Sequence, residues 1–439
     1  MSAGRIPGRD AFPPGFLLGV ASSAYQIEGH AAGGAGPTHW DSFAATPGNV
    51  ARAEDGALAC DHLIRWPEDL DLAAAMGADV WRFSTSWARV QPEGCGTVNA
   101  QGLDFYDRLV DGMLARGLKP ALTLYHWELP SALGDTGGWA NRETCLRFAD
   151  YAGLMADRLG DRVWSWAPVN EPWCVAWMGY FLGHFAPGLR DIRAAARAMH
   201  HVGLAHGLAI GALRAAGAGN LGAVVNMEHA APADDSPEAA AAAYRYDGIY
   251  NRWFMGGFLR GEWDADTLRA LEPHMPAGWQ EDMATIAAPV DWLGLNYYTR
   301  KLCAPAPPGT PWPALDHPPG PLPKTDIGWE IYPEGLGGFL RRIHAAAPGL
   351  PIHVTESGLA CAAEPDTTRI AYLAAHLDQV RAVIAEGVDV RGYYAWSILD
   401  NYEWADGYDQ RFGLVHVDFA SQIRRPRASW HELQRGWGR

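Results

Sequence analysis

The sequence is poor in positive charge and has no long apolar run, and each absence excludes a class of protein. Its 439 residues include 35 Lys and Arg against 50 Asp and Glu, a net charge of -15, so nucleic acid and anionic membrane surfaces would repel it. No run of about 18 apolar residues occurs, so we expect no membrane-spanning helix. Residues 1–10 are polar and Gly-rich and do not resemble a secretory signal, so we expect a cytoplasmic protein.

Closely spaced cysteines and metal-binding motifs are also missing. The six cysteines are scattered, with no C-x-x-C pair, and in a large chain without an export signal we expect reduced, mostly buried thiols. His200, His201 and His206 lie on a predicted helix, but without an H-E-x-x-H motif or a carboxylate at matching spacing, so we interpret them as structural or surface residues. The sequence therefore predicts no metal and no cofactor.

Tryptophan, by contrast, is abundant. The chain has 20 Trp residues, 48% hydrophobic residues and only 19% charged ones, which is typical of a folded globular protein with a large core. More than half of the Trp residues are expected to fill that core. The others suit a ligand with a flat apolar face, because an aromatic ring can stack on it while polar neighbours bind its edge.

Apolar, β-rich runs alternate with amphipathic helical segments along the whole chain. Helices predicted at 101–116, 142–159 and 366–386 are each followed by glycine, which commonly ends a helix, and Asp366 is the expected N-cap of the third. The predicted strands are 16–21, 80–87, 119–125, 163–167, 221–226, 292–298, 351–355 and 391–397.

Eight strands that are mostly followed by helices favour a parallel sheet covered by helices. Eight is also the number that closes a (β/α)₈ TIM barrel, so we predict an α/β fold, a single barrel domain over residues 1–439 with long βα loops. The alternative, two doubly wound domains, lacks a G-x-G-x-x-G motif and a P-loop. The Pro-rich stretch 304–323 is interpreted as one long loop because regular patterns resume on both sides of it.

Two short motifs each place a glutamate just after a predicted strand. Glu171 lies in Val-Asn-Glu-Pro at 169–172, and Glu356 lies in Val-Thr-Glu-Ser-Gly at 354–358. Two carboxyl groups in one cleft can cleave an acetal, because one donates a proton while the other attacks or activates water. The competing interpretation is that each glutamate is an ordinary surface residue at a strand end.

Other polar and aromatic residues also gather at the predicted strand ends, where barrel enzymes carry their chemistry. Buried polar groups are unfavourable unless they are paired, so a whole ring of them indicates a ligand with many hydroxyl groups. The ring consists of Gln26, Glu28, Arg82, Trp87, His126, Trp127, Asn170, Glu171, Asn226, Asn296, Tyr298, Glu356 and Trp396.

Seven motifs in this order resemble glycoside hydrolase family 1, the retaining β-glucosidase family, over nearly the whole chain. Asn-Glu-Pro alone occurs in other barrel glycosidases, whereas the ordered set is highly specific. The motifs are Phe16-Leu17-Leu18-Gly19 with Tyr25-Gln26-Ile27-Glu28-Gly29, Trp81-Arg82-Phe83-Ser84, Tyr125-His126-Trp127, Asn170-Glu171-Pro172, Gly294-Leu295-Asn296-Tyr297-Tyr298, Thr355-Glu356-Ser357-Gly358, and Trp396-Ser397-Ile398-Leu399-Asp400-Asn401 with Glu403-Trp404.

The resemblance implies a role for each site residue. Glu171 resembles the general acid/base and Glu356 the nucleophile, which Arg82 and Tyr298 would keep ionised. Asn296 and Tyr298 are two residues apart on a strand, so both would face the barrel interior. The residues that resemble the sugar site are Gln26, His126, Asn170, Trp396, Glu403, Trp404 and Phe412, and those that match the aglycone platform are Trp173 and Trp329, for which core packing is the alternative.

The implied activity is exo-acting, retaining hydrolysis of terminal β-D-glucosides, with β-fucosides and β-galactosides as further candidates. The implied partner is a small β-glucoside or oligosaccharide. Three alternatives stay open: transfer of the sugar to an acceptor other than water, use of phosphorylated disaccharides, and a non-catalytic glycan-binding relative. The chain departs from the family pattern at Ser357, where asparagine is usual, and at Leu18, where an aromatic residue is usual.

Overall fold

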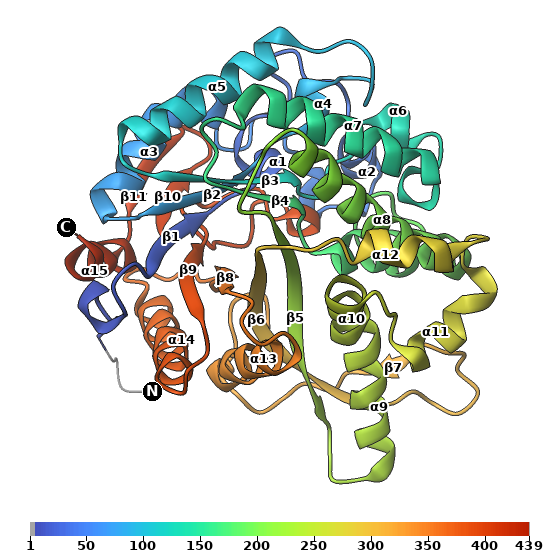
Figure 1. Cartoon of the computed structure of the whole chain (residues 1–439). Helices are drawn as coiled ribbons and strands as arrows, with labels where there is room; N and C mark the ends of the chain where they lie inside the picture. Colours follow the sequence, from blue (N-terminus) through green and yellow to red (C-terminus); the bar gives the residue numbers. More distant parts are fainter. Residues whose placement is uncertain (1–4, 439) are drawn as a thin grey trace.

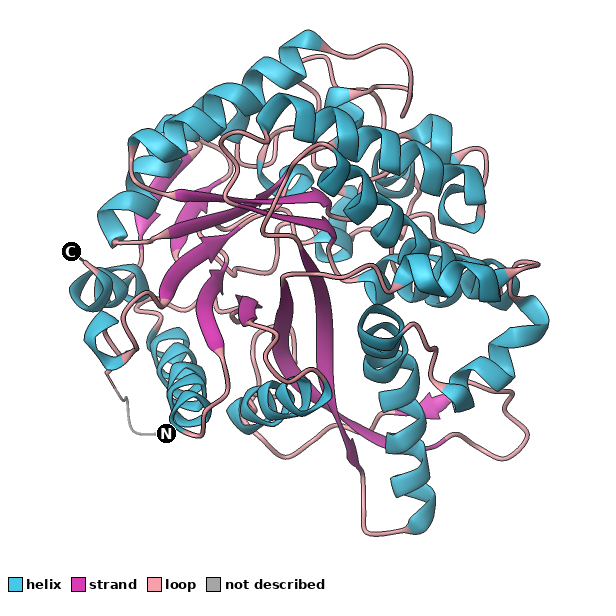
Figure 2. Ribbon diagram, in the orientation of Figure 1, coloured by secondary structure: helices cyan, strands magenta, loops and turns pink. Residues whose placement is uncertain are grey.

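The computed structural model describes residues 5–438, which form a barrel of parallel strands surrounded by helices (Figures 1 and 2). Around the barrel the strands pair in the order β4-β3-β2-β1-β9-β8-β6-β5. Two isolated parallel bridges, Trp166 with Leu221 and Asn170 with Val224, join β4 to β5 and complete the circle. The predicted α/β barrel is therefore confirmed. The barrel strands are β1 (Leu17–Ala21), β2 (Val80–Ser84), β3 (Lys119–Tyr125), β4 (Ser165–Val169), β5 (Gly222–Pro232), β6 (Trp292–Pro305), β8 (Ile352–Ser357) and β9 (Val390–Trp396).

Helices cover the outside of the barrel, and shorter elements lie in its loops (Figure 2). The α-helices are α1 (Ala24–Ile27), α2 (His39–Ala45), α3 (His62–Met76), α4 (Trp87–Val90), α5 (Ala100–Ala115), α6 (Ser131–Gly134), α7 (Arg142–Leu159), α8 (Ile192–Ala215), α9 (Pro237–Asp247), α10 (Trp253–Arg260), α11 (Ala265–Leu271), α12 (Met283–Ile286), α13 (Pro333–Ala346), α14 (Thr367–Ala385) and α15 (Ala428–Trp437). The other elements are the π-helical segments η4 (Cys174–Leu182) and η5 (Gly248–Arg252), the 3₁₀ turns η1 (Arg9–Ala11), η2 (Ala51–Ala53), η3 (Gly138–Ala140), η6 (Glu272–His274), η7 (Trp279–Asp282) and η8 (Trp404–Asp406), and the strands β7 (Leu315–Asp316), β10 (Val415–Asp418) and β11 (Ile423–Pro426).

Most predicted strands match observed ones, and the differences arise where the chain leaves the barrel. The predicted strand 80–87 ends at Ser84, because Ser86 caps α4 and Trp87 begins that helix. Strands β5 and β6 continue well beyond 226 and 298, pairing with each other as far as Pro232 and Cys303. The predicted loop 304–323 contains β7, which pairs with the end of β6.

Glycine ends α5 as predicted, since Gly117 has a left-handed φ of 72° just after the C-cap. Asp366 stands at the N-cap of α14 but makes no capping bond. Its carboxylate accepts hydrogen bonds from Arg369 and from Ser429 instead. The predicted N-cap position is therefore confirmed, while the buried carboxylate bonds to Arg369, three residues along the chain, and to the distant Ser429.

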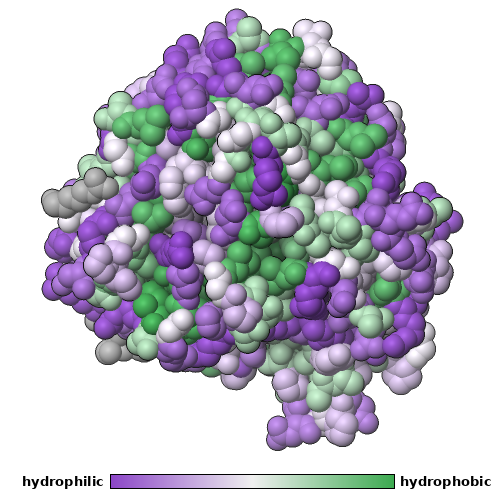
Figure 3. Space-filling model, in the orientation of Figure 1, coloured by the Kyte–Doolittle hydropathy of each residue, from purple (hydrophilic) through white to green (hydrophobic). Residues whose placement is uncertain are grey.

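The surface in the view of Figure 3 mixes hydrophilic side chains with smaller hydrophobic patches. Across residues 5–438, no helix combines the length and apolarity needed to cross a membrane. All six cysteines are free thiols, and only Cys95 is exposed.

A buried ion pair joins the first long helix to the C-terminal hairpin. Asp69 of α3 is fully buried, and both its oxygens accept from Arg424 of β11, at 2.8 and 3.1 Å. His62 Nδ1 lies 2.7 Å from the same carboxylate. Removing one partner of a buried pair leaves the other charge uncompensated, which is far more destabilising than losing an exposed pair.

We therefore expect Asp69→Ala to lower the free energy of unfolding by about 3–5 kcal/mol, because Arg424 would remain buried without its counter-charge. Asp71→Ala is the matched control on the same helix, since Asp71 is 67% exposed and pairs with Arg116. Its loss should lower stability by at most about 1 kcal/mol. Urea denaturation of both variants measures these free energies. If Asp69→Ala lowered the free energy of unfolding by no more than the control does, the buried pair would not be an important contact.

Candidate active site

Glu171 lies just beyond the end of β4 in a strained backbone conformation. Its φ is 48°, in the left-handed region that residues other than glycine rarely adopt. Trp127 after β3 (φ 80°) and Trp404 after β9 (φ 52°) share this feature. Such conformations cost about 1–3 kcal/mol each and persist only where the surroundings enforce them, typically at functional sites.

Glu356 lies within β8 and is held by side chains from two other strands, β2 across the barrel and the adjacent β6. Arg82 of β2 donates to Glu356 Oε1, and the hydroxyl of Tyr298 on β6 donates to Oε2 at 2.6 Å. The second terminal nitrogen of Arg82 donates to Asn170 Oδ1 at 2.7 Å. Both oxygens of Glu356 therefore accept charge-assisted hydrogen bonds, which favour its ionised form.

Asn296 connects the surroundings of the two glutamates. Its side-chain nitrogen donates to Glu171 Oε1 at 2.6 Å and to Asn170 Oδ1 at 3.0 Å, while its oxygen accepts from the Thr355 hydroxyl at 2.6 Å. The hydrogen bond from Thr355 fixes the orientation of the Asn296 amide, because its oxygen must face the hydroxyl donor. On β6, Asn296 and Tyr298 both contact a glutamate of the site, consistent with the prediction that they face the same side.

The two glutamates have unlike electrostatic surroundings. Burial, and after it the negative charge of Glu356, raises the pKa of Glu171 to about 8. Burial also raises the pKa of Glu356, but the charge of Arg82 and the hydrogen bonds from Tyr298 and Arg82 oppose that rise. Glu356 is therefore the first of the two to ionise, and near neutral pH Glu171 keeps its proton.

An inner cavity of about 330 Å³ contains both carboxyl groups. This volume lies at the lower end of the range for small-molecule sites. Gln26, Arg82 and Asn170 do not line the cavity. Gln26 donates a hydrogen bond to the lining residue Glu403, and Arg82 donates to the lining residue Glu356 and to Asn170. The predicted site residues that line the cavity are His126, Glu171, Asn296, Tyr298, Trp329, Glu356, Trp396, Glu403, Trp404 and Phe412.

One side of this cavity combines flat rings with a carboxyl group. The rings of His126 and Trp396 stack at 5.7 Å, and Trp127 packs against Trp404 at 4.9 Å. Glu403 accepts from Gln26 at 3.3 Å, and burial, with the charges of Asp406 and the two site glutamates, raises the pKa of Glu403 well above its usual range. A sugar offers such a wall both an apolar ring face and hydroxyl groups.

The inner cavity is lined by five carboxyl groups and by no Lys or Arg of the described part of the chain. An anionic ligand would find no cation in this lining and would be repelled by the ionised Glu356, whereas a neutral polyhydroxyl ligand would find many hydrogen-bond partners. The five are Glu171, Glu228, Glu356, Glu403 and Asp406.

An outer cavity of about 1000 Å³ adjoins the inner one. Trp329, predicted as an aglycone platform, lines both cavities. Trp173 lines only the outer one and packs against Tyr250 with ring centroids 4.0 Å apart.

Two strand-end candidates lie outside the site. Glu28 is buried and accepts hydrogen bonds from Arg89 at 2.8 Å and from the Tyr106 hydroxyl at 2.9 Å, so its role is structural. Trp87 is fully buried in the core. The residue after Glu356, Ser357, has its hydroxyl 3.4 Å from that of Tyr372, and it does not line the cavity, since adjacent strand residues face opposite sides.

Several lining residues were not identified from the sequence. Glu228 lies beyond residue 226, where the strand was predicted to end, and at an irregularity in the β5–β6 pairing between Met227 and His229 that no sequence pattern indicated. Tyr250 and Cys174 come from the π-helical segments η5 and η4, for which no sequence motif was recognised. The pairing of Asn226 with the Tyr250 hydroxyl, at 2.8 Å, is a tertiary contact.

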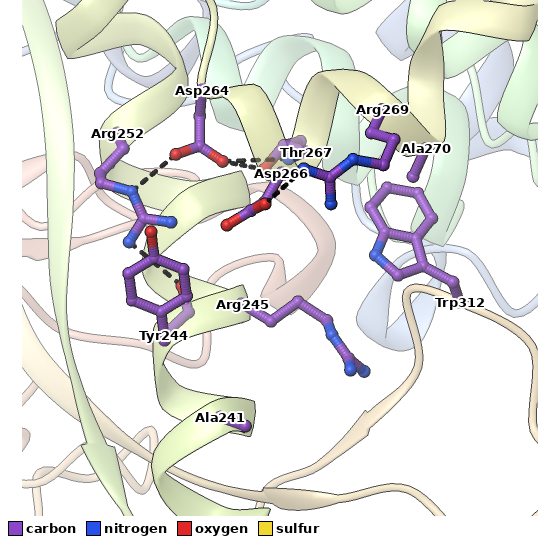
Figure 4. A pocket seen from close by; sticks show the side chains of 10 residues that line it. All are labelled: Ala241, Tyr244, Arg245, Arg252, Asp264, Asp266, Thr267, Arg269, Ala270 and Trp312. Atoms are coloured by element: carbon purple, nitrogen blue, oxygen red, sulfur yellow. Dashed lines mark hydrogen bonds and ion pairs between the residues drawn. The ribbon is translucent and has the colours of Figure 1, made fainter.

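A third cavity, of about 520 Å³, opens between α9 and α11 and is rich in charged residues (Figure 4). Its charges largely satisfy one another, since Arg252 donates to Asp264 at 2.7 Å and Arg269 pairs with Asp266 at 3.0 Å. Neither Glu171 nor Glu356 lines it. We therefore place the site in the inner cavity.

Within residues 5–438, no group of three or more His, Cys, Asp or Glu is arranged to hold a metal ion. The three histidines of α8 are buried. His200 Nε2 lies 2.8 Å from Asp282, and His201 Nδ1 lies 3.0 Å from the carbonyl oxygen of Trp139.

Comparisons with known proteins agree with this arrangement. The sequence model of glycosyl hydrolase family 1 matches residues 8–434. A beta-glucosidase from Agrobacterium sp. is 44% identical over 424 residues, which are 94% of this chain and 92% of the relative. A bifunctional beta-D-glucosidase/beta-D-fucosidase from Bifidobacterium breve is 41% identical, with 97% of each chain covered.

A solved structure gives the same result. The Thermotoga maritima family 1 glycoside hydrolase, complexed with a cyclophellitol analogue transition state mimic, superposes with a TM-score of 0.93 at 40% identity. The match covers 97% of this chain and 98% of that one. The likeness therefore extends over the whole barrel and its loops.

The electrostatic coupling of the two glutamates can be tested by titration. In Glu356→Gln the pKa of Glu171 should fall below its value of about 8, because a nearby negative charge is lost and Arg82 loses its counter-charge. Carbon-13 NMR of labelled carboxyl groups measures this value directly. Glu238→Gln, on the exposed face of α9, should leave it unchanged. An unaltered pKa in Glu356→Gln would mean that burial alone sets the proton affinity of Glu171.

Proposed function

The chain belongs to glycosyl hydrolase family 1, and we propose that it is a β-glucosidase that releases terminal glucose by double displacement. In this proposal Glu171 is the general acid/base and Glu356 the nucleophile. The observation that carries it is the pair of buried carboxyl groups in one cavity, of which only Glu356 is bonded to a cation. A β-fucosidase activity is a further candidate, because one relative is named for both activities.

In the first step, an oxygen of Glu356 attacks the anomeric carbon while the bond from that carbon to the leaving oxygen breaks. Glu171 gives its proton to the leaving oxygen, which its raised pKa allows. Arg82 and Tyr298 hold Glu356 ionised and aligned until it attacks. The products are the released alcohol and a glucosyl ester of Glu356.

In the second step, the ionised Glu171 takes a proton from water as the water oxygen attacks the same carbon and the ester bond to Glu356 breaks. Two inversions leave the β configuration unchanged. Activity should therefore be lost as pH rises through the pKa of Glu171, which then has no proton to give, and as pH falls through that of Glu356, which can then no longer attack.

We assign the sugar ring to the inner cavity, with Trp396 beneath its apolar face and Gln26, His126, Glu403 and Trp404 around its hydroxyl groups. Asn170 would contact the 2-hydroxyl, a bond that strengthens in the transition state of such reactions. The proposal for Asn170 rests on its fixed position, because Arg82 donates to its side-chain oxygen at 2.7 Å and Asn296 donates to it at 3.0 Å.

Transfer of glucose to another acceptor uses the same residues and differs only in what attacks the ester, so it stays an alternative. A non-catalytic relative would be expected to lack one of the glutamates, and both are present. The single-domain organisation and the cytoplasmic location stay predictions from the sequence.

Substitution of each glutamate tests the two roles. Glu356→Ala should abolish turnover of every substrate, because no glucosyl ester can form. Glu171→Ala should slow ester formation about 10²–10⁴-fold for poor leaving groups and far less for an aryl group that departs unprotonated. Pre-steady-state rates with 4-nitrophenyl β-glucoside and an alkyl β-glucoside separate this step from hydrolysis of the ester. Equal losses for both leaving groups would rule out Glu171 as the acid.

Substrate charge gives a second test. No Lys or Arg of residues 5–438 lines the inner cavity, which contains the ionised Glu356, so a 6-phosphate on the glucose would be repelled and would find no cation there. We expect kcat/KM for 4-nitrophenyl β-glucoside to exceed that of its 6-phosphate by at least about 2–3 kcal/mol in transition-state stabilisation. Comparable rates, or faster cleavage of the phosphorylated sugar, would favour the phosphorylated-disaccharide alternative.

A further inference from the structure

The inner and outer cavities share a narrow set of lining residues. Among the described residues, only Met178, Glu228, Tyr250 and Trp329 line both, so they form the neck between the two cavities. A group attached to the glucose must occupy this neck if its sugar ring fills the inner cavity. Glu228 is the only carboxylate among the four, and it is 7% exposed.

Glu228 is held in place from two sides. Its backbone N–H donates to Asn251 Oδ1 at 3.1 Å, and Asn251 Nδ2 donates to its carbonyl oxygen at 2.9 Å. On the side chain, the Tyr246 hydroxyl donates to Oε2. These bonds fix the direction of the carboxylate, and the backbone pair does not depend on the side chain.

The other side-chain oxygen of Glu228 is available to a ligand. Its nearest ion-pair partner, Lys301 Nζ, lies 3.9 Å from Oε1, beyond direct hydrogen-bond distance. No hydrogen-bond donor of the described residues reaches Oε1, and a ligand hydroxyl at this place would form a charge-assisted bond with it.

The outer cavity offers aromatic faces beyond the neck. Trp177 packs against Phe181 with centroids 4.5 Å apart and meets Trp312 edge-on at 6.3 Å. All three line the cavity of about 1000 Å³, which is at the upper end of ligand-site volumes. Aromatic faces accept the apolar sides of sugar rings.

We propose that Glu228 is a specificity-determining residue that accepts a hydrogen bond from a hydroxyl of the sugar next to the cleaved bond. The favoured substrates are then β-linked gluco-oligosaccharides, whose second sugar binds in the neck and whose further sugars reach the aromatic outer cavity. This inference rests on the proposed β-glucosidase function. A plain aryl group could fill the same space, but it would bring no donor to Glu228 and would exclude water from its carboxylate, which is unfavourable.

The test compares two substrates on matched variants. In Glu228→Ala, kcat/KM for cellobiose should fall about 10- to 100-fold, the range expected for a hydrogen bond to a charged group, and that for 4-nitrophenyl β-glucoside should change by less than about 3-fold. In Glu228→Gln, kcat/KM for cellobiose should fall less, because the amide oxygen still accepts a hydrogen bond. Glu238→Gln, an exposed glutamate on the neighbouring α9, is the control for charge alone and should change neither rate.

Binding without turnover provides the second measurement. In the Glu356→Ala background, calorimetry should show that Glu228→Ala lowers the affinity for cellobiose by a similar factor. The affinity for 4-nitrophenyl β-glucoside should stay nearly unchanged. An equal loss on both substrates, accompanied by a shifted pH profile, would overturn the inference, because Glu228 would then act through Glu171. No loss on either would also overturn it. A wild-type protein that cleaves neither glycoside, yet shows the selective loss of cellobiose binding, would disprove the proposed function and leave the assignment of Glu228 standing.

Discussion

The site depends on one electrostatic constraint: two carboxyl groups buried in the same cavity cannot both be ionised at low cost. The surroundings break the symmetry between them. Glu356 accepts from Arg82 and Tyr298, whereas Glu171 accepts from the neutral amide of Asn296. The charge therefore resides on Glu356 and the proton on Glu171. Every chemical role assigned above follows from that difference, because a nucleophile must be ionised and an acid must carry a proton.

The barrel makes this asymmetry possible by bringing residues that are distant in sequence together in its interior. Arg82, Asn296 and Glu356 belong to β2, β6 and β8, and each is held by hydrogen bonds across the barrel interior. Glu171 and Trp127 adopt left-handed backbone conformations just beyond β4 and β3. The scaffold thus positions the site before any ligand arrives, which is the condition for electrostatic stabilisation without reorganisation.

The two cavities differ in what they can recognise. The inner one is small and acidic and suits a neutral polyhydroxyl group, whereas the outer one is larger and walled by aromatic rings. At the neck between them, Glu228 combines a polar acceptor with the ring of Trp329. In the proposed function, the sugar and the group attached to it would therefore contact largely different residues, apart from those of the neck.

The eight-strand barrel and the two glutamates could be predicted from the sequence, because they depend on local patterns: alternating apolar runs, glycines after helices, and short motifs at strand ends. The same-side placement of Asn296 and Tyr298 also followed from the two-residue period of a strand. The sequence could not place Glu28 against Arg89 or Trp87 in the core, since both assignments depend on long-range partners. It also could not identify Glu228 and Tyr250, because β5 extends through its pairing with β6 and η5 reaches the cavity only in the folded chain. Helix and strand propensity and short motifs depend on local sequence. The direction of a carboxylate, its pKa and the cavity that it lines depend on groups that only the tertiary fold brings together.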